Sequence, residues 1–289
     1  MKDKRIMSKT VGIYLWTAVL AGMLGLTSSL TPLANGETIK IGGTGGAMGA
    51  MRVLADAYIK SRSVGGDIHV VFVPGLGSSG GRKALVGGAI DIALTSKPGD
   101  DPENLRGAKA LLYGRTPMVF ATSIKTNANA LTSQDLLDIW NGKTLHWPDG
   151  RRLRLIVRPE SDSDTEGLLR IPPAMGQAVK RALRREGMKV GVRDGDAADA
   201  LETTPGALGT STLALIISEK RSLKALTLDG VAPSAKTIAD GTYPHLKSLY
   251  ALAATKATGA GEGFMSFLRS PTARDTLTRL GFWVEDGTP

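Results

Sequence analysis

The hydrophobic pattern predicts that strands and helices alternate at the start of the chain beyond residue 36. Thr38–Gly43 alternates apolar and polar positions, which is typical of a half-buried strand. Apolar residues then recur at helical spacing over 47–60, and the nearly all-apolar run Asp67–Pro74 indicates a buried parallel strand. A short helix and a third strand at Ala89–Thr95 follow. This β-α-β-α-β order predicts a parallel sheet.

The rest of the chain shows the same mixture of apolar strands and amphipathic helices, which predicts an α/β fold. Thr132 or Ser133 is expected to cap a helix that Gly142 ends, because hydroxyls favour helix starts and glycine favours helix ends. The other expected elements are an extended stretch at Leu111–Ser123 interrupted by Pro117, strands at Arg154–Val157 and Ser248–Ala254, a helix at Ala174–Glu186, a turn at Pro205–Gly209 leading into a short strand, and a last helix begun by Ser270 and Pro271.

The first 36 residues have the composition of an export signal. Basic residues at positions 2–9 precede the apolar run Val11–Leu26, and Ala34 and Gly36 place small residues at −3 and −1 of a cleavage site before Glu37. The apolar run is short for a bilayer span, which needs about 20 residues. A cleaved signal peptide at 1–36 is therefore favoured over a retained membrane anchor, and the mature chain is expected in the periplasm.

Composition and charge narrow the range of possible functions. The 289 residues include no cysteine, which excludes disulfides, thiolate metal sites, cysteine nucleophiles and a lipid-anchored N-terminal cysteine. The net charge of +9 falls to +6 when residues 1–36 are removed, and it raises the question of an anionic partner. Export and an aromatic content of 5% argue against nucleic acid as that partner. The three histidines are far apart, so no metal or other cofactor is expected.

Three polar loops, each after a strand and before a helix, carry the candidate chemistry. They are Gly43–Gly46, Gly77–Gly81 and Arg158–Thr165. Each offers hydroxyls and unpaired backbone N–H groups at a helix start, where the helix dipole favours an anion. Arg158 is the only cation in these loops, and its guanidinium can hold two oxyanion oxygens at once. Together the loops predict a site for a small tetrahedral oxyanion.

These motifs resemble those of the periplasmic phosphate-binding proteins of ABC transporters. The segments that carry the resemblance are IKIGGTGGAMGAM, VPGLGSSGGRKALVGGAIDIALTSKP, LTSQDLLDIWNGK, LIVRPESDSDTEG and TPGALGTSTLALI. The resemblance implies a type II periplasmic binding protein, in which two Rossmann-like lobes joined by a two-strand hinge close over a ligand cleft. It implies a first lobe of 37–117 plus 249–289 and a second lobe of 118–248, with crossings near Arg115–Val119 and Ser248–Ala251.

The resemblance also implies a set of ligand contacts. Thr44 and the two glycines after it would offer hydroxyl and amide donors, and Asp164 would donate through its amide. Arg158 would pair with the anion and be held in turn by Glu160. The implied ligand-binding residues are Thr44, Gly45, Gly46, Ser78, Ser79, Ser96, Arg158, Ser163, Asp164 and Thr165.

Three departures from the family pattern bear on ligand choice. Ser96 stands where the family has an aspartate that accepts the proton of hydrogen phosphate, and a serine can donate a hydrogen bond instead. One extra residue separates Arg158 from Ser163–Thr165. Gly45 and Gly46 replace a bulkier or hydroxyl-bearing residue.

Two aspartates in the third loop could replace the missing proton acceptor. We hypothesise that Asp162 or Asp164 has this role, and the alternative for Asp164 is a helix N-cap. The hypothesis predicts that the wild-type protein binds phosphate much more tightly than sulfate. This difference in affinity should collapse in the Asp→Asn variants. Equal affinity for the two anions in the wild type would contradict it.

The expected function is that of an extracytoplasmic solute-binding protein that captures a small tetrahedral oxyanion, inorganic phosphate first, for an inner-membrane ABC permease. The protein is expected to be a monomer and not an enzyme. One alternative is a sensor or scavenger subunit for sulfate, phosphonate or arsenate that is not coupled to transport. An exported hydrolase is a further alternative, but neither Ser78 nor Ser163 has a histidine or a Ser-x-x-Lys pairing near it in the sequence.

Overall fold

The computed structural model describes residues 36–62, 67–97, 105, 107–171, 174–254 and 259–285. The predicted signal peptide, apart from Gly36, lies outside these residues. Every helix in the described part of the chain is too short or too polar to span a bilayer.

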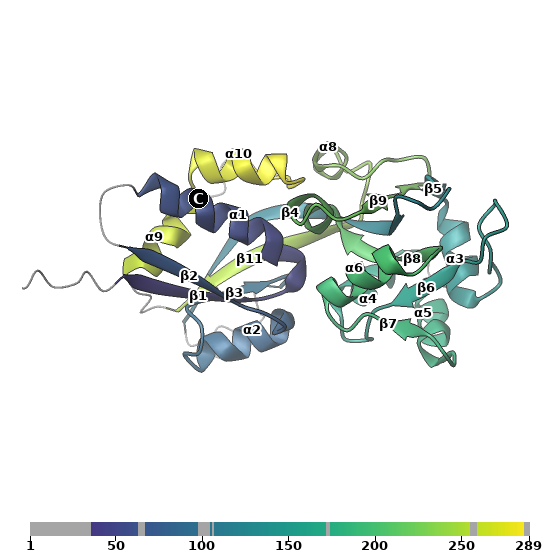
Figure 1. The fold of residues 1–289 in the computed structure, drawn as a ribbon, viewed down its shortest axis with the longest axis horizontal. Coiled ribbons are helices and arrows are strands. Elements are labelled where there is room, and N and C mark those ends of the chain that lie inside the picture. The colour runs from purple at the N-terminus through teal and green to yellow at the C-terminus, as the bar shows by residue number, and fades with distance from the viewer. Residues whose placement is uncertain are drawn as a thin grey trace, which may run out of the picture. The chain divides into compact units, whose positions relative to one another are not determined.

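The first three strands form the parallel sheet that the alternating pattern predicts (Figure 1). β1 (Glu37–Gly43) pairs in parallel with β2 (Ile68–Val73) on one side and with β3 (Ile92–Thr95) on the other. The connecting helices are α1 (Gly45–Ser61) and α2 (Gly77–Val86).

The Gly-Ser-Ser-Gly-Gly segment at 77–81 is not the loop that its composition predicts, because it forms the first turns of α2. Glycine and serine are weak helix formers, and tertiary packing overrides that weakness here. Gly81 is buried so close to β1 that a Cβ on it would lie 2.8 Å from Gly43 Cα. The missing side chain therefore lets α2 approach the sheet.

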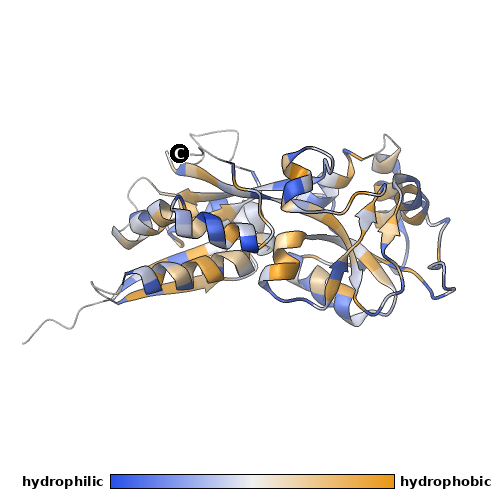
Figure 2. Cartoon of the chain, turned by 90° about the horizontal axis from the view of Figure 1, so that it is seen from above, coloured by the Kyte–Doolittle hydropathy of each residue, from blue (hydrophilic) through white to orange (hydrophobic). Residues whose placement is uncertain are grey.

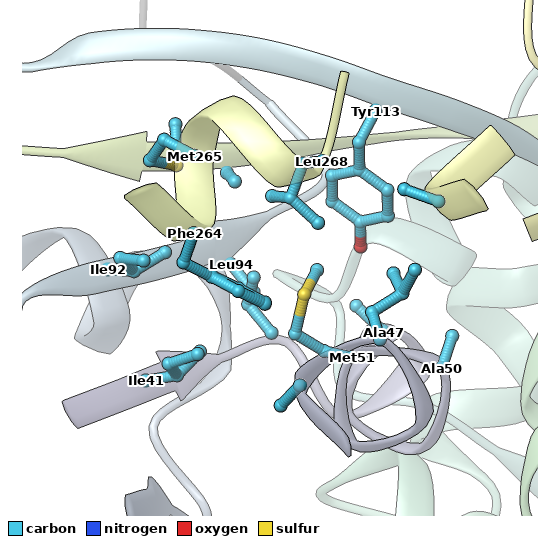
Figure 3. Packing of buried hydrophobic residues seen from close by; sticks show 14 of the residues in the cluster. Ile41, Ala47, Ala50, Met51, Ile92, Leu94, Tyr113, Phe264, Met265 and Leu268 are labelled. Carbon is cyan, nitrogen blue, oxygen red and sulfur yellow. The ribbon is translucent and has the colours of Figure 1, made fainter. Parts of the chain in front are cut away.

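Helices cover both faces of this sheet. Ile92 and Leu94 of β3 join a cluster with α1, α9 (Gly259–Phe267) and α10 (Pro271–Arg279), whereas Ala93 joins a smaller one with Leu85 of α2. This division follows from the alternation of side chains along a strand. Figure 3 shows Phe264 of α9 packed beside Leu94 in the larger cluster. Each such burial stabilises the fold by about 1.5–3 kcal/mol.

Two long antiparallel strands connect this sheet to the second half of the fold. β4 (Lys109–Ser123) pairs with β11 (Leu246–Ala253) as far as Pro117, and from Met118 its neighbour is β8 (Ala207–Thr212). The continuous strand order is β2-β1-β3-β11-β4-β8-β6-β7, with β6 (Arg154–Val157) parallel to both β8 and β7 (Lys189–Val190).

Pro117 does not interrupt the extended stretch as predicted, since β4 is one strand of 15 residues. The proline lies where the strand changes partners, and proline is tolerated at the end of a hydrogen-bonded ladder.

Residues of the second half build their own hydrophobic clusters. Phe120 of β4 packs with Trp140 and Leu208, whereas its neighbour Val119 packs with Leu201 on the opposite face of the strand. Figure 2 shows apolar strands in the interior and polar residues scattered over the helices. The remaining elements are β5 (Ala130–Leu131), α3 (Ser133–Asn141), α4 (Ser163–Leu168), α5 (Met175–Arg184), β7 (Lys189–Val190), α6 (Asp194–Thr203), α7 (Leu213–Ser218), β9 (Leu223–Ala225), β10 (Thr227–Leu228) and α8 (Ala235–Ala239).

Thr132 begins α3 with a reciprocal capping box. Its Oγ1 accepts from the Asp135 N–H at 3.0 Å, and Asp135 Oδ2 accepts from the Thr132 N–H at 2.8 Å. We expect Thr132→Ala to lower the free energy of unfolding by about 1 kcal/mol, because the Asp135 N–H loses its side-chain acceptor. Urea denaturation measures the change. Gln134→Ala on the exposed side of the same turn is the control, expected within about 0.5 kcal/mol of wild type, and equal effects of the two changes would contradict the role of the cap.

Candidate functional site

A cavity of about 750 Å³ lies at the ends of β1 and β3, beside the starts of α1, α2 and α4. The carboxyl ends of parallel strands are where open α/β sheets bind ligands. Seven of the predicted ligand-binding residues line the cavity: Thr44, Gly45, Ser78, Ser79, Ser96, Arg158 and Ser163. Gly46, Asp164 and Thr165 are outside the lining.

The start of α1 presents two hydrogen-bond donors. Gly43 makes the turn out of β1 with φ +138°, and a Cβ on it would lie 2.0 Å from the Leu94 carbonyl oxygen. Thr44 is the N-cap of α1, but its hydroxyl makes no capping bond. Its Oγ1 lies 3.4 Å from Oδ2 of Asp194, and the Gly46 N–H donates to the same oxygen at 2.9 Å. A carboxylate from α6 therefore accepts hydrogen bonds from two predicted anion donors.

Serine hydroxyls form a second group of donors in the cavity. Ser78 Oγ accepts from the Ser96 N–H at 3.2 Å and lies 3.3 Å from Ser96 Oγ. Ser79 lies beside Arg82, whose guanidinium also donates to Thr95 Oγ1 at 3.1 Å. A hydroxyl can donate to a ligand or accept from it, so this group suits an oxyanion in more than one protonation state.

Arg158 is buried, with 4% of its surface exposed, and acceptors surround its guanidinium. Nε and Nη2 donate to the two oxygens of Asp162 at 3.2 and 2.7 Å, Nη2 also donates to Asp194 Oδ1 at 3.2 Å, and Nη1 donates to the Gly191 carbonyl at 2.9 Å. The expectation that Glu160 holds Arg158 is wrong. Glu160 is exposed, whereas Asp162 begins α4 and faces back toward the guanidinium.

Asp162, not Asp164, caps α4. Its Oδ1 accepts from the Asp164 N–H at 2.9 Å, so the amide that was expected to reach the ligand is bonded within the loop. The buried Asp164 side chain pairs instead with the buried Lys247 of β11. Thr165 Oγ1 donates to the Pro159 carbonyl at 2.8 Å. The helical turn directs these two side chains away from the cavity. Asp164 therefore neither faces the cavity as an acceptor of the ligand proton nor caps α4. Asp162 stays the candidate acceptor of that proton.

Burial and neighbouring charges shift the pKa values in this cluster. Burial alone would lower the pKa of Arg158, but the charges of Asp194, Asp164 and Asp162 outweigh it and raise that pKa. Burial raises the pKa of Asp162, and the nearby Asp164 charge adds to this effect against the attraction of Arg158. The guanidinium is therefore a permanent cation shared among several carboxylates.

Acidic and basic side chains nearly balance around the cavity. The cations in its lining are Arg82, Lys97, Arg158 and Arg193, and the acids are Asp162, Glu166, Asp194, Asp196 and Glu219. Lys97 and Glu166 pair with each other at 2.6 Å. The positive charge of the whole chain is therefore not concentrated at the cavity, and an anion placed there would depend on directed hydrogen bonds.

Asp194 is the main residue that sequence reasoning missed. It is the first residue of α6 and lies 150 residues from Thr44 along the chain. The local signal was an acidic start, Asp194-Gly195-Asp196, before an alanine-rich run, which predicts a helix N-terminus. Such a start says nothing about a distant partner, and only the fold brings the carboxylate to α1.

Comparisons with known proteins define the class. The profile of the PBP superfamily domain, the superfamily of periplasmic binding proteins, matches residues 30–272, and the chain belongs to this family. The phosphate-binding protein PstS of Bacillus subtilis is 24% identical over 293 residues, which cover 96% of this chain and 92% of that protein. PstS of Borreliella burgdorferi is 23% identical over 89% of this chain and 94% of its own length. The resemblance to phosphate-binding proteins is thereby confirmed.

Solved structures show the same fold. A protein from Clostridium perfringens, crystallised with bound phosphate, has a TM-score of 0.71 at 18% identity, and the match covers 86% of this chain and 100% of that one. The molybdate-binding protein of Azotobacter vinelandii has a TM-score of 0.60 at 15% identity, and the match again covers 86% of this chain and 100% of that one. The predicted type II periplasmic-binding-protein fold is confirmed. The lobe boundaries at 117/118 and 248/249 stay a prediction.

Proposed function

We propose that the protein is the solute-binding component of an ABC importer for a small tetrahedral oxyanion, with inorganic phosphate as its preferred ligand. One observation carries the proposal: the Gly46 N–H, the Thr44 hydroxyl and the Arg158 guanidinium converge on the two oxygens of one carboxylate. We call these three donors the anion seat. Donors that converge on a carboxylate also suit the oxygens of phosphate. The similarity to PstS proteins supports phosphate as the first candidate.

The anion seat explains why ligand binding would close two lobes. Thr44 and Gly46 belong to the proposed first lobe, 37–117 plus 249–289, and Arg158 belongs to the proposed second lobe, 118–248. A ligand that bonds to both sides favours the arrangement in which they meet, and the paired strands β4 and β11 would serve as the hinge. Ser78 and Ser96 would contact the anion from the α2 side.

The setting of the protein follows from the same proposal. Residues 1–36 would direct export and be cleaved before Glu37, which would leave a periplasmic protein without a lipid anchor. The mature chain would act as a monomer and hand its ligand to an inner-membrane permease. Its role would be binding without catalysis.

A thermal-shift screen tests the proposed ligand class. The mature protein, freed of phosphate by dialysis, is titrated with phosphate, arsenate, sulfate, a phosphonate and molybdate. A ligand at about 100 times its Kd should stabilise the protein by about 2.7 kcal/mol, and phosphate should give the largest shift at equal concentration. The absence of a shift with every oxyanion would contradict the proposal.

A further inference from the structure

One carboxylate in the cavity lining stands in the place proposed for the ligand. The Asp194 side chain is 13% exposed, and each of its oxygens bonds to the anion seat. Oδ2 accepts from the Gly46 N–H at 2.9 Å and lies 3.4 Å from Thr44 Oγ1, and Oδ1 accepts from Arg158 Nη2 at 3.2 Å. The two carboxylate oxygens thus hold the donors that an oxyanion would need.

The start of α1 has room for this carboxylate because residue 45 lacks a side chain. A Cβ on Gly45 would lie 3.0 Å from both the Cβ and Oδ2 of Asp194, which is closer than ordinary contact. A Cβ on Gly46 would meet nothing nearer than 3.6 Å. The glycine at position 45 is therefore the one whose absent side chain admits Asp194.

The donors of Arg158 indicate what happens when the Asp194 carboxylate leaves. A guanidinium has five N–H groups. Two of them bond to Asp162, one bonds to the Gly191 carbonyl and one bonds to Asp194. Departure of Asp194 would leave one N–H on each terminal nitrogen, which is the pair that can hold two oxygens of one oxyanion.

We infer that Asp194 is a tethered competitor for the anion seat, so that an incoming oxyanion must displace its carboxylate. The inference rests on the proposed function. A carboxylate and an unprotonated oxyanion cannot share these donors, since like charges a few ångströms apart repel strongly in a partly buried site. Because the carboxylate is part of the chain, its effective concentration at the seat is on the order of millimolar or above. Asp194 therefore weakens the apparent affinity for the free anion and sets the ligand concentration at which the protein fills.

Isothermal titration calorimetry of phosphate and of sulfate, in phosphate-free buffer, tests the inference on the mature protein and three variants. Asp194→Ala removes the competitor, and Asp194→Asn keeps an acceptor for the Gly46 N–H without the charge. Asp196→Asn is the matched control: it removes one negative charge from the same cavity and the same helix turn, and asparagine can still accept from the Arg193 N–H as Asp196 does at 3.1 Å. Thermal melting checks that each variant is folded.

We expect the Kd for phosphate to fall at least about tenfold in Asp194→Ala and by less in Asp194→Asn, with Asp196→Asn within about twofold of wild type. Sulfate binding should strengthen in parallel, because a competitor acts against any oxyanion. Unchanged or weaker phosphate binding in Asp194→Ala would overturn the inference. Weaker phosphate binding combined with stronger sulfate binding in Asp194→Asn would also overturn it, since Asp194 would then accept the ligand proton.

A ligand-free measurement separates this inference from the proposed function. In a double-mutant cycle on the unfolding free energy without anion, Thr44→Val and Asp194→Ala should be coupled, because the two side chains meet across the cavity. An absence of coupling would overturn the inference. A wild-type protein that binds no oxyanion while Asp194→Ala binds phosphate would contradict the proposed function but support the inference. Coupling without anion binding by any variant would contradict the proposed function and, with it, the competition.

Discussion

Replacing Arg158 with methionine is expected to weaken phosphate binding at least about a hundredfold. Each charge-assisted hydrogen bond contributes about 1.5–3 kcal/mol, and the guanidinium can offer two of them to one anion. The substitution also leaves Asp162 and Asp194 without their cation, so their carboxylates would repel the ligand. Calorimetric titration with phosphate measures the loss.

Two further variants make the Arg158 result specific. Arg158→Lys keeps the charge but loses the planar fork, and about tenfold weaker binding is expected. Lys97→Met removes a cation from the rim of the same cavity, where its side chain is 51% exposed. Screening by salt should keep that effect within about threefold. A folded Arg158→Met protein that binds phosphate as tightly as wild type would exclude Arg158 from the anion seat.

Lys247→Met is expected to lower the free energy of unfolding by about 3–5 kcal/mol. Lys247 and Asp164 are both buried and pair with each other, and removing one partner leaves an uncompensated buried charge. The double variant Lys247→Met with Asp164→Leu should recover most of the loss, because an apolar pair of similar volume carries no charge to desolvate. Urea denaturation of the wild type, the two single variants and the double variant measures this double-mutant cycle. A double variant no more stable than Lys247→Met alone would contradict this account.

The buried Asp164–Lys247 pair also makes the free energy of unfolding depend on pH, in a direction that follows from the two pKa shifts. Burial alone would raise the pKa of Asp164, but the attraction of Lys247 and Arg158 outweighs it and lowers the pKa. Burial alone would lower the pKa of Lys247, but the charges of Asp164, Asp194 and Asp162 raise it. The contribution of Asp164 is therefore present above the unfolded pKa of about 3.9 and lost as the pH falls through the lower folded value. The contribution of Lys247 to the unfolding free energy is present below the unfolded lysine pKa of about 10.4. It is lost as the pH rises through the higher folded pKa.

A comparison of acid sensitivity checks this sign. Between about pH 4 and pH 2, the wild-type protein should lose more unfolding free energy than the double variant, which lacks the titrating pair. Equal acid sensitivity of the two proteins would mean that Asp164 is not held ionised by its buried partner.

Much of the fold could be predicted because its signals are local. The strands β1, β2 and β3 and the helix α1 each follow an apolar period of their own, and a sheet with these connections can only be parallel. Thr132 and Gly142 mark the ends of α3 by their own chemistry. The candidate site was predictable in outline for a related reason: glycines, hydroxyls and Arg158 cluster directly after strand ends.

Other elements could not be predicted because tertiary contacts decide them. The weak helix formers at 77–81 become helical where Gly81 meets β1. Pro117 lies inside one continuous strand because β4 changes its partner there. The role of Asp164 in the third loop also depends on a neighbour that is distant in sequence, because its side chain pairs with the buried Lys247.

The sequence by itself determined the class of this protein, the parallel sheet at its start, and three donor-rich segments at the ends of strands, since each depends on patterns of a few neighbouring residues. Only the tertiary structure decided how those donors are used. It brought Asp194 across 150 residues to Thr44, and it added Asp194 to the carboxylate partners of Arg158. Hydrogen bonds and ion pairs act over a few ångströms, and no local pattern records which distant residue the folded chain will bring within that distance.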